Sequence, residues 1–226
     1  MMKNSRTIAA GSILVLALAG LACAQGPMGG MLGPQPRGIF NPIVGSGAQY
    51  EIQRGADGNV KKMSMEIDVI GKEASDGKDG YWLETSANTP VGDMVVKVLT
   101  VQDGANTSVT RTIMQMAGRP ATEMPAMGRM QQKQSLDIRS EADKVGSESV
   151  TTPAGDFTAD HYRMKNGSGD FWVSEKVSPI GLIRYQGKDM TMVLTKVVTG
   201  AKDKITGTPV PFNPALMMGG GGAPQQ

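Results

Sequence analysis

Residues 146–199, GSESVTTPAGDFTADHYRMKNGSGDFWVSEKVSPIGLIRYQGKDMTMVLTKVVT, decide the fold. This stretch holds the single histidine of the chain, one of its two tryptophans and two of its four tyrosines. Its alternating runs are separated by turn-forming pairs such as Asn166-Gly167, which accept the positive φ angles that tight hairpins need. The stretch therefore predicts consecutive antiparallel strands, at 157–164, 170–174, 181–186 and 190–199.

The same period of two continues on the N-terminal side. Its clearest example is MSMEIDV at 63–69, in which apolar residues alternate with Ser, Glu and Asp, as is typical of an amphipathic strand. No segment has the period of a three-turn amphipathic helix. Looser runs predict further strands, at 48–53, 81–84, 94–101, 108–116 and 136–138. We therefore predict an all-β fold with few or no helices, an antiparallel sheet of about ten strands curled over a core.

The N-terminus has the three parts of a secretory signal peptide. A short positive region precedes an apolar run at 8–22, which ends in Ala22-Cys23-Ala24-Gln25. The run is too short for a confident membrane span, so we expect cleavage after Ala24 and no transmembrane span in the mature chain. The alternative is lipoprotein processing with Cys23 as the acylated first residue. Either route predicts an exported protein, periplasmic or extracellular.

Composition divides the rest of the chain and excludes several classes of function. Both flanks are rich in Gly and Pro and poor in charge, which predicts disorder. We expect a signal peptide at 1–24, a leader at 25–47, one β domain at 48–206 and a tail at 207–226.

With one histidine and no cysteine after cleavage, disulfides and ordinary zinc sites are excluded. The mature chain is close to neutral without a basic cluster, which argues against nucleic-acid binding.

Three motifs within the deciding stretch carry a family resemblance. They are GSESVTTPAGDF at 146–157, DFWVS at 170–174 and VSPIGL at 177–182. Together they resemble a pattern of uncharacterised exported bacterial proteins similar to the lipoprotein-carrier class. The resemblance implies an unclosed antiparallel β-barrel, a half-barrel around an apolar hollow, over roughly residues 50–205. The chain departs from that class in having no obvious lid helix.

Few residues suggest catalysis. His161 has no Gly-x-Ser-x-Gly motif to accompany it, and Asp160 is its strand neighbour and so points to the opposite face. Glu66 and Asp68 share the polar face of one strand. Such a pair can bind a cation or act as acid and base, but we expect both to be solvated surface charges. We predict no catalytic residues, no enzyme activity and no cofactor.

Two sets of side chains remain as binding candidates. Met124, Met127 and Met130 follow one another at a spacing of three, and thioethers bind Cu(I). These are the candidate metal ligands, although flexible apolar packing is their expected role. The second set consists of aromatic residues that could line a ligand hollow, with core packing as the default role: Trp82, Phe171, Trp172 and Tyr185. Phe171 and Trp172 are adjacent in a strand and must point to opposite faces.

These expectations combine into a function without a named substrate. We predict an exported, non-enzymatic protein that binds a lipid-like or other hydrophobic ligand, or an envelope partner, on the concave face of a half-barrel. The alternatives are a structural or interaction module of the cell envelope, acting through its open sheet edges, and a methionine-based Cu(I)-binding protein.

Overall fold

The described part of the chain is one β-sheet unit. The computed structural model describes residues 38–55, 60–89, 92–103, 106–125 and 137–213, all within the second of two units of the chain, Pro36–Gln226. This part has twelve strands, one 3-10 helix (Ile138–Ser140) and no α-helix, which confirms the all-β prediction. The strands are β1 (Ser46–Arg54), β2 (Lys61–Ser75), β3 (Lys78–Thr89), β4 (Gly92–Asp103), β5 (Asn106–Met116), β6 (Thr122–Met124), β7 (Ala142–Thr152), β8 (Gly155–Met164), β9 (Gly169–Val173), β10 (Leu182–Gly187), β11 (Met190–Thr199) and β12 (Val210–Pro211).

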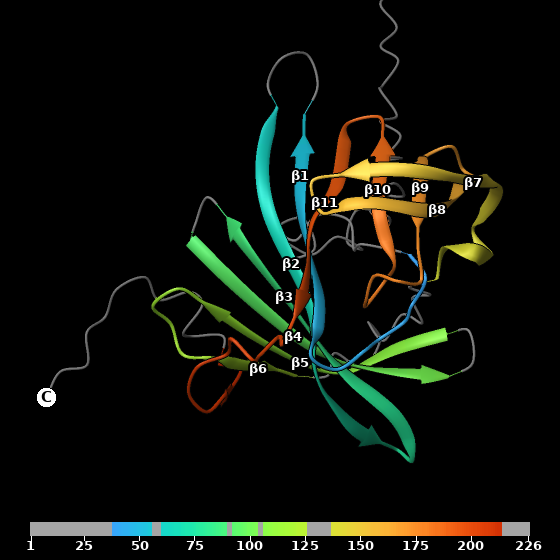
Figure 1. Cartoon of the computed structure of the whole chain (residues 1–226). Coiled ribbons are helices and arrows are strands. Elements are labelled where there is room, and N and C mark those ends of the chain that lie inside the picture. The colour runs from blue at the N-terminus through green and yellow to red at the C-terminus, as the bar shows by residue number, and fades with distance from the viewer. Residues whose placement is uncertain (1–37, 56–59, 90–91, 104–105, 126–136, 214–226) are drawn as a thin grey trace, which may run out of the picture. The chain divides into compact units, whose positions relative to one another are not determined.

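All twelve strands belong to a single sheet, in the order β12-β6-β5-β4-β3-β2-β1-β11-β10-β9-β8-β7. Neighbouring strands are antiparallel except β12 and β6, which are parallel. Strand β1 pairs with β2 on one side and β11 on the other (Figure 1). It thereby joins the two arms of the sheet, one made by β2–β6 and β12 and the other by β7–β11. The two end strands of this order, β12 and β7, are not paired with each other, so the sheet is unclosed, as the half-barrel resemblance implied.

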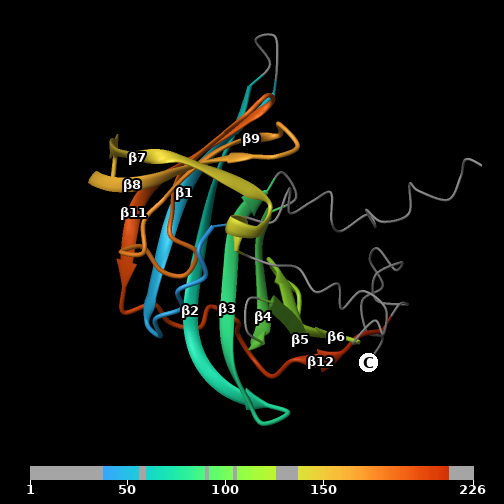
Figure 2. The same ribbon diagram turned by 90° about the vertical axis from the view of Figure 1, so that its right-hand side faces the viewer.

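The sheet curls so that β7 and β8 cross in front of β1 and β11 (Figures 1 and 2). Between these layers lies the main hydrophobic core, made by buried side chains of β1, β2 and β7–β11. Tyr50 of β1 is fully buried there and donates a 3.1 Å hydrogen bond to the carbonyl of Leu182. We call the face of the sheet toward this core the inner face and the opposite face the outer face. Four methionines of β1's neighbouring strands β2 and β11 are buried in this core or packed against it: Met63, Met65, Met190 and Met192.

The structure differs from the strand predictions at β7 and around Ile138. Residues 143–149 of β7 are all exposed, so this edge strand has little of the apolar alternation from which strands are recognised. Ile138, predicted in a short strand, lies instead in the 3-10 helix, where Asp137 accepts a hydrogen bond from the Arg139 backbone. That prediction was wrong for Ile138; its companion Leu136 lies outside the described residues.

Structure continues beyond both expected domain boundaries. Ile39, in the segment predicted as a leader, is buried and donates a backbone hydrogen bond of 2.7 Å to Ile180. Strand β12 lies in the predicted tail and pairs with β6 through the register Val210↔Thr122. In both places the chain gains order by pairing with a distant segment, which local composition does not reveal.

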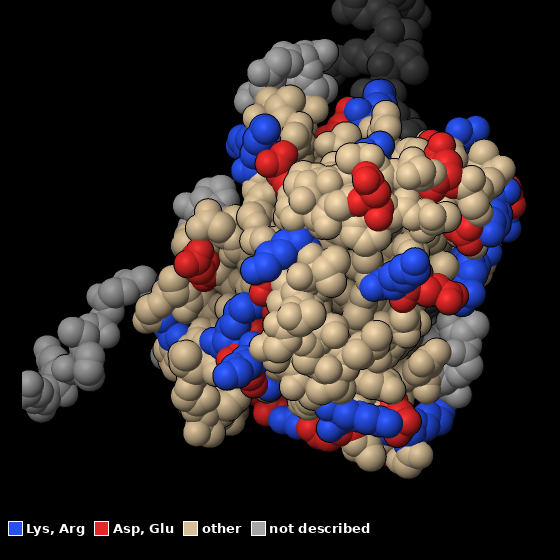
Figure 3. All heavy atoms as spheres, viewed as in Figure 1, with Lys and Arg blue, Asp and Glu red and all other residues tan. Residues whose placement is uncertain are grey.

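Charge is mixed on the surface. Lys and Arg lie next to Asp and Glu on the face seen in Figure 3, with broad uncharged areas between them. This distribution agrees with the nearly balanced 23 basic and 21 acidic residues of the chain. Among the described residues, no helix has the length and apolar character needed to cross a bilayer.

Candidate functional site

Among the described residues, the main core fills one half of the inner face, and several apolar side chains of the other half are only half-buried. Over β1, β2 and β9–β11 the main core covers the inner face. Over β4–β6 the cross-strand register places a row of apolar side chains on this face, and each is half-buried. We call this row the inner strip; its members are Val96, Val98, Met114, Met116 and Met124. Among the described residues, none of the five belongs to a hydrophobic cluster.

The four aromatic candidates do not converge on one hollow. Phe171 and Tyr185 lie on the inner face, where their rings pack 4.7 Å apart against the main core. Trp82 and Trp172 lie on the outer face, in different arms of the sheet. The adjacent pair therefore separates as its strand geometry requires, with Phe171 inward and Trp172 outward.

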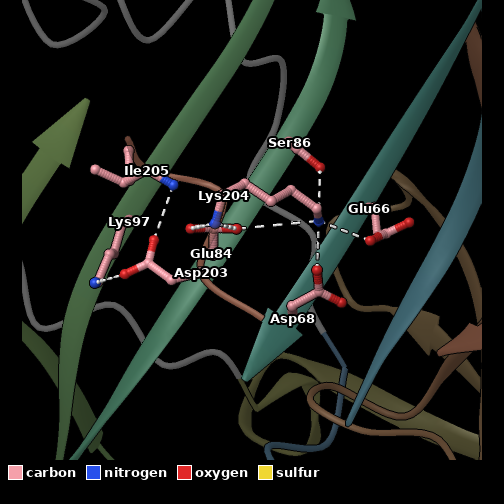
Figure 4. Close-up of polar contacts among 8 residues, drawn as sticks. All are labelled: Glu66, Asp68, Glu84, Ser86, Lys97, Asp203, Lys204 and Ile205. Carbon is pink, nitrogen blue, oxygen red and sulfur yellow. Dashed lines mark hydrogen bonds and ion pairs between the residues drawn. The ribbon is translucent and has the colours of Figure 1, made fainter. Parts of the chain in front are cut away.

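A C-terminal strap, residues 201–206, covers part of the outer face. It crosses β2–β5 and is anchored to each of them. Lys204 bonds to side chains of β2 and β3, and Asp203 bonds to Lys97 of β4 (Figure 4). Thr206 bonds to Gln115 of β5. Its Ile205 packs against an apolar cluster formed by Trp82, Leu99, Ile113 and Ala121. The strap thereby removes a polar row of the sheet from water.

Lys204 is the centre of this arrangement. Its ammonium nitrogen Nζ lies 2.6 Å from Asp68 Oδ2, 2.7 Å from Glu66 Oε1 and 3.2 Å from Ser86 Oγ. Its backbone N–H donates to both carboxylate oxygens of Glu84, each at 3.1 Å. Asp68 and Glu84 have no exposed surface, so the strap supplies the positive charge and the donors that two buried carboxylates need.

Burial dominates the proton equilibria of this cluster. It raises the pKa of Glu84 to about 7, against the smaller lowering by the Lys204 backbone hydrogen bond, and the Asp203 carboxyl adds to the rise. Burial and the neighbouring Glu66 carboxyl together raise the pKa of Asp68, against the lowering by Lys204. For Glu66 burial acts in the same direction, but hydrogen bonds from Lys204 and Asp68 outweigh it and lower its pKa. One atom, Asp68 Oδ1, is buried without a hydrogen-bond partner in the described structure.

This cluster corrects the sequence-based interpretation of Glu66 and Asp68. We predicted two solvated surface charges, and for Asp68 that prediction is wrong because the strap covers it. The strap sequence, AKDKIT, is polar and has no strand period, so nothing local indicated that it would pack on a sheet. The ammonium group of Lys204 already occupies the position where a cation would balance these carboxylates.

The second polar region of the outer face is an open cleft over β8, β9 and β10, which we call the outer cleft. It has a volume of about 490 Å³ and is lined mainly by β8, β9 and the two hairpin turns at this end of the sheet. His161 and Trp172 are cross-strand neighbours here, and their rings stack 4.5 Å apart at an angle of 11°. Asp170 Oδ1 lies 2.7 Å from His161 Nε2 and accepts a 2.9 Å hydrogen bond from Arg163 Nε.

The histidine thus has an acidic partner that sequence reasoning missed. Asp160 does point away from His161, as strand alternation requires, and bonds Ser147 and Lys144 instead. The partner is Asp170, one strand across, and only the pairing of β8 with β9 reveals it.

The methionine candidates are only partly described. Met124 lies on β6 at the edge of the inner strip, whereas Met127 and Met130 lie outside the described residues. Within the described ranges, no group of three or more His, Cys, Asp or Glu side chains is arranged to hold a metal ion.

Comparison with known proteins adds no family. No protein-family model matches the chain, and a search of curated proteins found no match either. Among solved structures, one similar chain is described as "a putative exported protein with YmcC-like fold" from Bacteroides fragilis, with 12% identity, 71% of this chain and 99% of that chain covered, and a TM-score of 0.36. Another is "a putative lipoprotein" from Parabacteroides distasonis, with 14% identity, 72% and 100% coverage, and a TM-score of 0.36.

Proposed function

We propose that the protein is an exported, non-enzymatic binding protein whose inner strip holds a hydrophobic, lipid-like ligand. The observation that carries the proposal is the contrast within the inner face, where one half is sealed by the main core and the other presents half-buried valines and methionines. Contiguous apolar surface that the fold leaves accessible is a common mark of a binding site. Export rests on the signal-like N-terminus.

The composition of the strip favours an adaptable apolar ligand. Three of its five side chains are methionines, which are unbranched and polarizable and can repack around ligands of different shape. Val96 and Val98 provide the rigid part of the surface on β4, and Met114 lies directly opposite Val96 on β5. Such a surface suits acyl chains, whose binding depends on apolar contact area more than on directed polar contacts.

The edge of the sheet favours this proposal over a partner added by strand pairing. The end strand β7 has a bulge between Lys144 and Gly146, and it carries exposed charges at Asp143, Lys144 and Glu148. Bulges and charges on an edge strand oppose the addition of another strand. We therefore rank the hydrophobic ligand above an interaction module that uses this edge.

The test is titration with a fluorescent fatty-acid analogue. The wild-type protein should bind the probe saturably and release it to unlabelled fatty acid. Val98→Asp, which places a carboxylate in the part of the strip on β4, should weaken binding at least tenfold, since burying an unpaired charge against an acyl chain is strongly unfavourable.

Val145→Asp is the matched control, because Val145 is 53% exposed on β7, far from the strip in the strand order. It makes the same substitution and should bind as the wild type does. Circular dichroism establishes that both variants are folded. Equal affinity of the wild type and Val98→Asp, or no saturable binding by the wild type, would overturn the proposal.

A further inference from the structure

We infer that the outer cleft is a second binding site, independent of the inner strip, for a small hydroxylated molecule that carries a carboxylate or phosphate group. Its volume of about 490 Å³ lies within the range of roughly 300–1,000 Å³ found for small-molecule sites. The cleft lies on the outer face, whereas the inner strip lies on the inner face and in the other arm of the sheet.

The charges that line the cleft favour an anion. Among the described lining residues Asp170 is the only acidic one, and both of its hydrogen bonds, from Arg163 and with His161, use one oxygen, Oδ1. Glu148 of β7 does not line the cleft, but its Oε1 lies 3.7 Å from His161 Nδ1. Arg163 and Lys188 bring two positive charges to the lining. In the described structure, neither the Arg163 Nη atoms nor Lys188 Nζ has an acceptor. A forked guanidinium beside an ammonium is a common way of holding a carboxylate or phosphate.

The cleft also offers groups for hydroxyls. Asp170 Oδ2 has no partner within the described ranges, and the Gln186 side chain lines the same cleft. A carboxylate oxygen accepts from a hydroxyl, and an amide both donates and accepts. The carboxylate or phosphate group of the ligand therefore pairs with the two cations. Hydroxyl groups elsewhere on the ligand hydrogen-bond with Asp170 Oδ2 and the Gln186 amide.

The turns and side chains that form the cleft are fixed by a hydrogen bond and by ring stacking. The Tyr185 hydroxyl donates to the carbonyl of Ser168, at 3.0 Å, and fixes the β8–β9 turn over β10. A Cβ atom at Gly187 would lie 2.3 Å from that hydroxyl oxygen, so glycine is needed for this close approach. On the adjoining strands, the stacked rings of His161 and Trp172 form a second fixed wall. A cleft with fixed walls loses little conformational entropy when a ligand binds.

The single histidine makes the test direct, because the chain has only one imidazole Hε1 proton and its NMR signal belongs to His161. The probes are glucuronate, glucose 6-phosphate, inorganic phosphate and neutral glucose, each titrated at constant pH and ionic strength. We expect saturable shifts of the His161 signal with glucuronate, glucose 6-phosphate or both, and weaker binding of inorganic phosphate. The first two arms distinguish a carboxylate ligand from a phosphate ligand, and glucose should give no saturable shift.

The double change Arg163→Gln with Lys188→Gln should weaken binding at least tenfold. Lys144→Gln is the control: Lys144 lies on the neighbouring strand, pairs with Asp160 at 2.7 Å and does not line the cleft. It should change affinity less than twofold. The His161 signal reports in each variant that the local fold is intact.

Three results would overturn the inference: no saturable shift with any anionic probe, glucose binding as tightly as the anionic sugars, or unchanged affinity in the double variant. None of them bears on the inner strip. Failure of the fatty-acid titration would likewise leave the outer cleft unaffected, so the two sites are tested separately.

Discussion

Of two charged regions on the outer face of the same sheet, one is covered by another segment of the chain and the other is open to solvent. The cluster under the strap holds two buried carboxylates, Asp68 against the ammonium group of Lys204 and Glu84 against its backbone N–H. The outer cleft holds Asp170 against Arg163, whose side chain is 61% exposed. Both are built from strand residues that alternate with core residues. The difference is a covering segment: residues 201–206 cross one region, and the other is an open cleft.

This difference separates structural charge from charge that a ligand can reach. A sealed carboxylate needs its partner within the protein, because it cannot be solvated. An open group can exchange its water for a ligand. The inner face repeats the contrast with apolar groups, since the main core seals one half and the inner strip stays accessible. We therefore assign stability to the sealed regions and binding to the open ones.

The largest expected effect follows from removing the ammonium of the strap. Lys204→Met should destabilise the protein by about 3 kcal/mol, because it leaves Asp68 buried without a counter-charge. Lys188→Met in the outer cleft should stay within about 0.5 kcal/mol of wild type. Urea unfolding measures both. Equal losses in the two variants would contradict the distinction between sealed and open charges.

A backbone contact gives the next largest effect. Gly47 lies beneath Asp68, and a Cβ atom there would lie 1.9 Å from Asp68 Oδ1 and 2.6 Å from the carbonyl oxygen of Ile67. Gly47→Ala should cost about 2 kcal/mol through overpacking. Gly146→Ala is the control, since its Cβ would meet no atom within 4 Å. Thermal unfolding of both variants measures the two changes in stability. An unchanged stability of Gly47→Ala would contradict the prediction, because it would show that the surrounding backbone accommodates the added methyl group.

The sealed cluster should also make stability depend on pH. Burial raises the pKa of Glu84 to about 7 in the folded protein, from its usual value of 4.5. Between these values the folded state binds a proton that the unfolded state has released, so stability falls as pH rises from about 4.5 to 7. We expect a loss of about 1–2 kcal/mol over this range, since the full difference in pKa corresponds to at most about 3 kcal/mol.

Glu84→Gln should remove most of that loss, and the raised pKa of Asp68 accounts for a remaining fall in the same direction. The carboxyls with lowered pKa, Glu66 and Asp203, act in a different window, because their contribution is lost as pH falls through their folded pKa values. Urea unfolding at pH 5, 6, 7 and 8 separates the two effects. A wild-type curve that rises between pH 5 and 8 would contradict the role of Glu84.

The smallest expected effect is at the open cleft. Trp172→Phe removes the indole hydrogen bond to Glu148 but keeps an aromatic ring beside His161. Because Glu148 is half-exposed, the loss should stay below about 1 kcal/mol. Trp82→Phe should cost more, since Trp82 is 8% exposed and also loses a 2.8 Å bond to Glu73. A larger loss of stability from Trp172→Phe than from Trp82→Phe would contradict the distinction between open and sealed regions.

The sequence indicated the strands of the sheet better than its contacts across strands. Residues 63–69 alternate so clearly that β2 and its inward Met65 and Ile67 followed directly from the pattern. Strand β7 was less evident because an exposed edge strand needs no apolar face. The partnership of His161 with Asp170 depends on strand register, and the burial of Asp68 depends on a strap 136 residues away in the chain. Both are long-range consequences of folding that no local pattern encodes.

The most direct test of hydrophobic ligand binding is the protein's own content when purified from its native envelope. Organic extraction followed by mass spectrometry should recover a lipid in near-stoichiometric amount from the wild type and from Val145→Asp, and far less from Val98→Asp. No lipid from the wild type, or equal amounts from all three proteins, would contradict the assignment of the inner strip.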